Sequence, residues 1–108
     1  MDTQFKKGVL ELVVLLVLSR QDQYGYQLVN EVNKIISVNE GTIYPLLKRL
    51  TKEKYCEAYL EPSDKGPARK YYKITVSGRA YLDVIAKQWL IFSENVNSYI
   101  RENLDTEK

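Results

Sequence analysis

Two basic segments near the middle of the chain limit its possible folds more than any other feature. Residues 41–50 read GTIYPLLKRL, and residues 67–75 read PARKYYKIT. In the first, apolar residues recur at helical spacing, which predicts a short amphipathic helix with a basic outer face. The second predicts a basic β-strand that returns from a turn. A helix that can enter a groove, with a cationic hairpin behind it, is the order of elements in a winged helix-turn-helix DNA-binding domain.

The positive charge of the chain is concentrated in the same middle part. Residues 41–79 contain nine Lys and Arg against four Asp and Glu, so they carry +5. Residues 1–40 contain four against five and residues 80–108 three against five, so the flanks carry −3 and the whole chain +2. Such asymmetry favours an anionic partner for the middle segment, although a basic helix face can also be no more than a solvated surface.

The composition argues against catalysis, metal binding and membrane insertion. The chain has no His and a single Cys, so it lacks the residues of zinc sites and of His-based catalysis. We therefore expect no enzyme activity, no cofactor and no metal. The apolar stretch at residues 9–18 is interrupted by Glu11 and is much shorter than the ~20 residues of a membrane helix. No secretory signal precedes it, so we expect a cytoplasmic protein.

Two helices are predicted before the basic segment. Residues 5–19 are apolar almost all round, which is typical of a helix buried on several sides. In so small a domain, we expect part of this coverage to come from a second subunit. Residues 24–36 form the second helix, with an apolar stripe of Leu28, Val32 and Ile35.

The basic segment is predicted to form a third helix that ends near residue 54. Asn39 is suited to its N-cap, and Pro45 is expected to disturb the first turn without breaking the helix. Thr42 and Lys48 lie off the apolar stripe and are candidates for reading base edges, while Tyr44 can donate to a phosphate. The predicted DNA-binding residues, including those of the hairpin, are Asn39, Gly41, Thr42, Tyr44, Pro45, Lys48, Arg49, Lys65, Arg69 and Lys70.

The rest of the chain is predicted to form the hairpin and one long helix. Residues 56–61 and 69–74 read as strands around a turn at residues 62–67. Thr75 can cap a helix that runs to about residue 103 and extends ~42 Å, too far for this domain to cover. Its apolar residues form a heptad seam that requires a partner helix. The seam consists of Leu82, Ile85, Trp89, Phe92, Val96 and Tyr99.

Together these elements predict a mainly α fold with a small β-hairpin. Residues 1–75 are expected to form the winged helix-turn-helix domain, and residues 76–108 a C-terminal dimerisation helix.

The sequence resembles the PadR family of transcriptional regulators over essentially its whole length. The matching features are Gly8 before the apolar helix, Tyr24-Gly-Tyr26, the two basic segments, and Gly78-Arg79 at the start of the last helix. The single C-terminal helix is similar to that of the small subclass of the family. Ala68 departs from the pattern, because many relatives have a further basic residue there, and Cys56 replaces a more usual aliphatic residue.

The resemblance implies a homodimer that binds near-palindromic operator DNA, usually as a repressor, and is released by a small molecule. In the family the N-terminal and C-terminal helices form the dimer. The interface residues expected here are Val9, Val13, Leu82, Ile85, Trp89, Phe92, Val96 and Tyr99.

A small planar hydrophobic ligand is a further expectation from the resemblance. Relatives that sense drugs enclose flat aromatic ligands between paired Trp side chains of the last helix, and Trp89 is the only Trp of this chain. The expected effector-binding residues are Trp89, Phe92 and Leu15. An aromatic residue at a heptad position is also often dimer core, so both interpretations of Trp89 stay open.

Two alternatives concern the function as a whole and Cys56. A winged helix can serve as a protein-interaction module without reading DNA, although such a module has no need of Thr42, Tyr44, Lys48 and Arg69 on one face. Cys56 can be a redox sensor or a buried strand residue, and without a second Cys or a strong cation nearby the buried residue is favoured.

Overall fold

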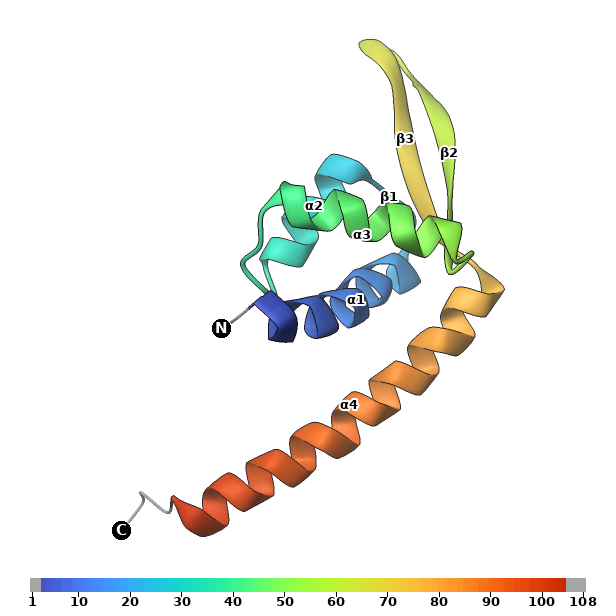
Figure 1. Ribbon diagram of the computed structural model, residues 1–108. Helices are drawn as coiled ribbons and strands as arrows, with labels where there is room; N and C mark the ends of the chain where they lie inside the picture. Colours follow the sequence, from blue (N-terminus) through green and yellow to red (C-terminus); the bar gives the residue numbers. More distant parts are fainter. Residues whose placement is uncertain (1–2, 105–108) are drawn as a thin grey trace.

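Helices and strands alternate along the chain in the order of a winged helix. The computed structural model describes residues 3–104, and the side chains from residue 8 onward. The elements are α1 (Thr3–Arg20), β1 (Gln23–Tyr24), α2 (Gly25–Asn33), α3 (Glu40–Lys52), β2 (Cys56–Ser63), β3 (Gly66–Ile74) and α4 (Val76–Asn103). In Figure 1, α1, α2 and α3 form one group, the β2–β3 hairpin projects above it, and α4 runs below it. The predicted fold class is confirmed.

α1 is buried almost all round by its own chain. Its buried side chains are Leu10, Leu12, Val13, Val14, Leu15, Val17 and Leu18. The helix contacts α2 on one side, α4 on another and β3 at the sheet. The expectation that a second subunit must cover this helix is therefore wrong for most of its surface. Leu16 is the exposed exception.

The sheet has three antiparallel strands in the order β1–β3–β2. Sequence reasoning missed β1, which is only two residues long. Its register aligns Tyr24 with Tyr71, and Tyr71 in turn with Tyr59. The three rings form a row on the outer face, with centroids 5.6 Å apart at each step. The Tyr59 hydroxyl donates to Asp22 at 2.6 Å, and this hydrogen bond raises the pKa of Tyr59 to about 12. The row therefore ties the base of the hairpin to the segment after α1.

The hairpin is longer than predicted. Ser63 pairs with Gly66, so only Asp64 and Lys65 form the turn, where the sequence predicted a turn over residues 62–67. Both prolines of that stretch lie inside strands. Pro has no N–H group to donate, so strands tolerate it where no neighbouring strand needs a donor, as at edges and irregular positions. β2 is an edge strand with an irregular register between Glu61 and Ser63, and β1 pairs only with Tyr71 and Tyr72 of β3, so Pro67 has a free side.

The core lies between α1, the inner faces of α2 and α3, and the sheet. Leu28 and Val32 of α2 are buried as predicted, but α2 ends at Asn33, and Ile35 beyond it is 63% exposed. The placement of Ile35 in the buried stripe is therefore wrong. α3 follows its prediction closely: Asn39 caps it, the helix continues through Pro45, and Ile43, Leu47 and Leu50 are buried.

The junction between the hairpin and α4 is closely packed around Gly78. Thr75 caps α4, since its hydroxyl oxygen accepts from the Gly78 N–H at 3.0 Å. The Thr75 and Ser77 hydroxyls donate to the Lys54 carbonyl at 2.6 and 2.8 Å. A Cβ at position 78 would collide with the Tyr55 carbonyl oxygen and lie 2.8 Å from Ile74. Only Gly allows α4 to start this close to the end of α3.

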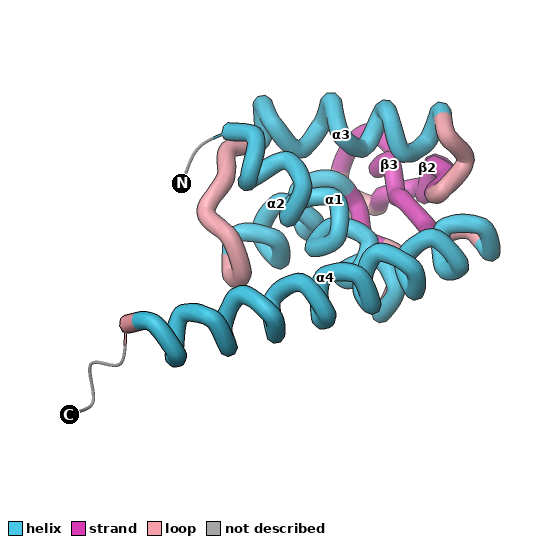
Figure 2. The backbone as a smooth tube through the Cα atoms, turned by 60° about the horizontal axis from the view of Figure 1, so that its bottom comes forward, coloured by secondary structure: helices cyan, strands magenta, loops and turns pink. Residues whose placement is uncertain are grey.

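The C-terminal part of α4, beyond Phe92, is mostly exposed. Figure 2 shows α4 projecting past the other elements, and the molecule extends 60 Å along its longest axis. The seam changes from buried to exposed along the helix. Leu82 is buried, Ile85 and Trp89 are half-buried, and Phe92 and Tyr99 are 56% and 68% exposed.

Gly78→Ala should destabilise the fold, because the added methyl group has no space without a backbone shift. Overpacking of this kind costs ~1–3 kcal/mol. Thermal denaturation followed by circular dichroism, at fixed protein concentration, measures the loss. Gly8→Ala is the matched control: position 8 is helical with open space around it, so its melting temperature should stay the same or rise. Equal melting temperatures for Gly78→Ala and the wild type would contradict the tight junction.

Candidate nucleic-acid interface

The outer face of α3 is polar, basic and exposed. With Ile43, Leu47 and Leu50 turned into the core, the helix exposes Gly41, Tyr44, Pro45, Lys48 and Lys52. Neither Lys48 nor Lys52 has a salt bridge within 4.0 Å among the pairs found in the described residues. These ammonium groups are available to an anionic partner. Lys52, also expected from the sequence to lie along the DNA backbone, is exposed on this face.

The start of α3 is fixed by its own polar residues. The Asn39 side-chain oxygen accepts from the Thr42 N–H at 3.1 Å and from the Thr42 hydroxyl at 3.3 Å. Thr42 is half-buried on the α1 side of α3, where it lines a hollow of about 260 Å³ together with Leu10 and Arg49. Both residues thus stabilise the first turn, and the Thr42 hydroxyl is already engaged there.

Tyr44 has a packing role as well as an exposed edge. A Cβ on Gly25 would lie 2.8 Å from the Tyr44 hydroxyl oxygen and 3.0 Å from its Cε1. The Tyr44 ring therefore packs against the start of α2, in the space that Gly25 leaves open. The side chain is still 41% exposed. Sequence reasoning found no structural reason for this aromatic residue, and its contact with Gly25 supplies one.

Arg49 is held on the other side of α3 by two carboxylates. Its Nη2 lies 2.8 Å from Glu11 Oε1 on α1, and its Nη1 lies 2.8 Å from Glu53 Oε1. The hydrogen bond with Glu11 raises the pKa of Arg49 further above its already high value. The Arg49 guanidinium thus joins α3 to α1, and its contact with DNA stays a prediction. No sequence signal indicated the pair, because its members are 38 residues apart.

Glu11 has a second partner on α4. Its Oε2 accepts from the Tyr81 hydroxyl at 2.9 Å. Burial, together with this hydrogen bond, raises the pKa of Tyr81 to about 12, so the hydroxyl keeps its proton and remains a donor. The Tyr81 ring is stacked on Tyr55 with centroids 4.2 Å apart and planes 2° from parallel.

The hairpin carries its cations on exposed positions. Lys65 is in the turn, and Arg69 and Lys70 follow on β3, where successive side chains point to opposite faces. The Arg69 guanidinium carbon lies 4.7 Å from the Tyr24 ring centroid, and Lys70 Nζ lies 5.8 Å from that of Tyr72. Such cation–π contacts support the positions of the two side chains while their charged ends stay in solvent. Tyr72 and Ile74 are buried.

A groove of about 500 Å³ lies between α1 and α4. It is lined by Gly8, Val9, Glu11, Leu12, Tyr81, Ile85, Gln88, Trp89 and Phe92. The Trp89 and Phe92 rings lie 6.2 Å apart at 49°. Two of the three predicted effector residues thus lie together. The placement of Leu15 with them is wrong, because Leu15 is 0% exposed in the domain core.

The predicted interface residues divide into a buried and an exposed group. Val13 and Leu82 are buried in the core of their own chain, which leaves almost no surface for a partner and corrects their assignment. Val9, Ile85 and Trp89 are half-buried, while Phe92, Val96 and Tyr99 are exposed. The surface available for dimerisation therefore lies mainly along the C-terminal part of the seam.

Cys56 is a buried strand residue. Its side chain is 1% exposed, and its Sγ lies 3.3 Å from the Thr51 hydroxyl oxygen. Burial raises the pKa of the Cys56 thiol, which disfavours the reactive thiolate. This environment supports the structural interpretation over the redox sensor.

In the part of the chain that the structure describes, none of the helices combines the length and the hydrophobicity that a membrane span requires.

Comparison with solved structures finds the same arrangement in bacterial regulators. A PadR-like transcriptional regulator of Bacillus cereus is 42% identical with a TM-score of 0.83, covering 92% of this chain and 98% of that one. A transcriptional regulator of Streptococcus is 36% identical with a TM-score of 0.81, covering 91% and 98%.

Comparisons with curated proteins and with family models point to the same family as the solved structures. An uncharacterized protein of Lysinibacillus sphaericus is 33% identical over 98 residues, which is 87% of this chain and 90% of that protein. The transcriptional regulator YqjI of Escherichia coli is 29% identical over 98 residues, but these are only 45% of its length. The model of the PadR-like transcriptional regulator family matches residues 14–84. With the matched residues extending from α1 into α4, the chain belongs to the PadR-like family of transcriptional regulators.

Proposed function

We propose that this protein is a homodimeric, sequence-specific DNA-binding repressor. The observation that carries the proposal is the exposed basic face of α3 beside the projecting hairpin. The face of α3 carries Lys48 and Lys52, and the hairpin carries Lys65, Arg69 and Lys70. A helix in the major groove with a cationic hairpin beside it contacts base edges and phosphates together. In this proposal Lys48 reads a base edge, the Tyr44 hydroxyl donates to a phosphate, and the hairpin follows the DNA backbone.

The proposal divides the chain at the start of α4. Residues 1–75 contact DNA, and residues 76–108 hold two protomers together. Support comes from the exposed apolar seam, since burying apolar surface contributes about 25 cal/mol per Å². Two copies related by a two-fold axis present two α3 helices to one side of a near-palindromic operator. Such a regulator acts in the cytoplasm, together with its DNA.

We also propose that the α1–α4 groove binds an effector, a small molecule that regulates DNA binding. The half-buried Trp89 and exposed Phe92 of the groove offer two ring faces to a small planar hydrophobic or phenolic molecule. The groove lies next to the exposed seam, so its occupant can alter how two protomers pack. Binding there would release the operator.

Lys48→Ala and Tyr44→Phe should weaken operator binding. Loss of a base or phosphate contact costs ~1–3 kcal/mol, so we expect about a tenfold or larger rise in Kd for Lys48→Ala. Tyr44→Phe keeps the ring against Gly25 and removes only the hydroxyl. Fluorescence anisotropy with DNA from upstream of the chain's own gene measures both.

Lys87→Ala is the matched control, because Lys87 is an exposed lysine on α4 and its loss changes the net charge equally. Its Kd should equal that of the wild type. Unchanged binding by both Lys48→Ala and Tyr44→Phe would contradict the proposed role of α3. Absence of binding by the wild-type protein to any DNA would favour the protein-interaction module.

Val96→Glu should dissociate the dimer, because the two-fold axis brings a second copy of the seam against the new charge. Analytical ultracentrifugation should show a monomer for this variant and a dimer for the wild type. Lys87→Glu, an exposed charge change off the seam, should remain dimeric. A wild-type monomer, or a Val96→Glu dimer of wild-type stability, would be evidence against dimerisation through α4.

A further inference from the structure

One carboxylate on α1 joins the helix that faces DNA to the helix that carries the groove. Glu11 uses Oε1 for Arg49 on α3 and Oε2 for Tyr81 on α4. Its side chain is 16% exposed, so it lies below the surface but within reach of it. Among the hydrogen bonds and ion pairs of the described residues, Glu11 is the only side chain bonded to both helices.

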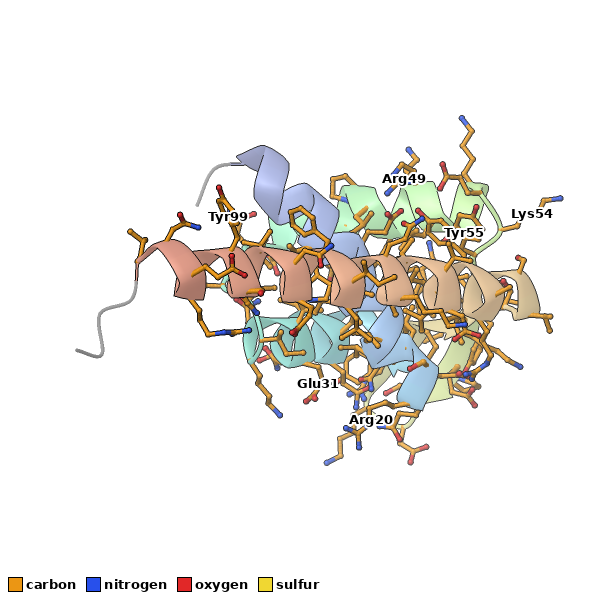
Figure 3. The ribbon with its side chains drawn as sticks, turned by 90° about the horizontal axis from the view of Figure 1, so that it is seen from below. Arg20, Glu31, Arg49, Lys54, Tyr55 and Tyr99 are labelled. Atoms are coloured by element: carbon orange, nitrogen blue, oxygen red, sulfur yellow. The ribbon has the colours of Figure 1, made fainter. Side chains whose placement is uncertain are left out.

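Tyr81 adds a second connection to the same end of α3. Its ring is stacked on Tyr55, whose N–H donates to the Leu50 carbonyl at 2.9 Å. Figure 3 shows Arg49 and Tyr55 on the same side of α4. The position of α3 relative to α4 is therefore fixed at two neighbouring points, and Glu11 controls one of them directly.

Glu11 and Tyr81 also line the α1–α4 groove. Among the described residues that line it, Glu11 is the only one with a charged side chain, and Arg49 is not part of the lining. In the part of the chain whose side chains are described, the groove therefore combines three aromatic rings, those of Tyr81, Trp89 and Phe92, with one carboxylate and no cation. This composition is complementary to a planar aromatic molecule that bears a cationic hydrogen-bond donor.

Arg49 can lose Glu11 without becoming unpaired. Its Nη1 keeps the bond to Glu53, the C-cap residue of α3, and the Arg49 side chain is 47% exposed. Partly exposed ion pairs of this kind are individually weak. A cation bound in the groove can therefore replace Arg49 as the partner of Glu11 with only a small loss of free energy.

We propose that Glu11 is the positioning residue through which an occupant of the groove acts on α3, and that the occupant is a planar aromatic cation. The inference rests on the proposed DNA-binding function. The ligand stacks against Trp89 and Phe92, and its cationic donor binds the Glu11 carboxylate in place of Arg49. α3 then loses its tie to α1, the two α3 helices of the dimer no longer hold a fixed spacing, and operator affinity falls.

The ligand class is tested on the full-length protein without DNA. Calorimetric titration with 9-aminoacridine, a cation at neutral pH, and with acridine, neutral in the same buffer, compares two flat rings of the same size. In the wild type 9-aminoacridine should bind about tenfold more tightly, by ~1.4 kcal/mol. Both should quench the emission of Trp89, the only Trp. Glu11→Gln should bind the two equally, at the wild-type affinity for acridine.

A preference for 9-aminoacridine that survives in Glu11→Gln would overturn the role of Glu11 in recognition. Equal binding of both compounds by the wild type would overturn the cation preference and leave the groove as an effector site. Absence of quenching by either would reject the groove itself.

The coupling to α3 is tested by operator binding of Glu11→Gln without ligand. Gln keeps hydrogen-bonding capacity toward Arg49 and Tyr81 but loses the ion pair. Removing a negative charge should by itself strengthen binding to DNA. We expect the opposite, a rise in Kd of roughly three- to tenfold, within the range for residues that transmit coupling. The salt dependence should keep its wild-type slope, because no phosphate contact is lost.

Glu94→Gln is the matched control, since Glu94 is an exposed carboxylate on α4 whose nearest cation, in Arg101, lies 3.9 Å away. It should bind the operator as tightly as the wild type or slightly more so. If Glu11→Gln behaves like this control, the coupling is refuted while the DNA-binding function stands. If the wild type itself does not bind DNA, the proposed function fails and the coupling fails with it.

Discussion

The burial of α1 is the constraint on which the other elements depend. Leu10, Val14, Leu15 and Leu18 are essentially inaccessible, and the helix contacts α2, β3 and α4. A helix that is apolar on all sides must be surrounded, so its neighbours have little freedom of position. Glu11 is the only charged residue between residues 9 and 18, and it makes the polar bonds to α3 and α4. α1 thus also carries the ion pair that, among the described residues, connects it to α3.

This arrangement separates the two sides of α3. Lys48 and Arg49 are adjacent in the sequence and look equivalent as basic residues. The first is exposed on the outer face, while the second binds Glu11 and Glu53 on the α1 side. Lys48 is thus available for the proposed contact with DNA, while the neighbouring Arg49 attaches α3 to α1.

Local signals predicted most elements and several of their ends. Thr75 as a cap and the helix to residue 103, Asn39 as a cap, and the hairpin all follow from short sequence patterns. Two residues contain no periodicity, so the sequence does not predict β1. The predicted turn is too long because Pro62 and Pro67 are typical turn residues but lie in strands here. Ile35 lies at helical spacing from Leu28 and Val32, but α2 ends at Asn33, so Ile35 is not part of the buried stripe.

Contacts between distant residues account for the errors at the candidate site. Charge at position 49 indicated only a DNA contact, because nothing local reveals the ion pair of Arg49 with Glu11. The coverage of α1 by its own chain, and with it the burial of Val13 and Leu15, depends on how four elements pack together. Periodicity indicates that a face is buried, but it does not identify what covers that face.

The most direct test of a dimer that reads DNA through two α3 helices is hydroxyl-radical footprinting on the DNA upstream of the chain's own gene. The proposed geometry predicts two protected segments related by a two-fold axis, with centres one helical turn, about 10 base pairs, or a multiple of it apart. A single protected patch, or no protection at concentrations where the protein is dimeric, would contradict it.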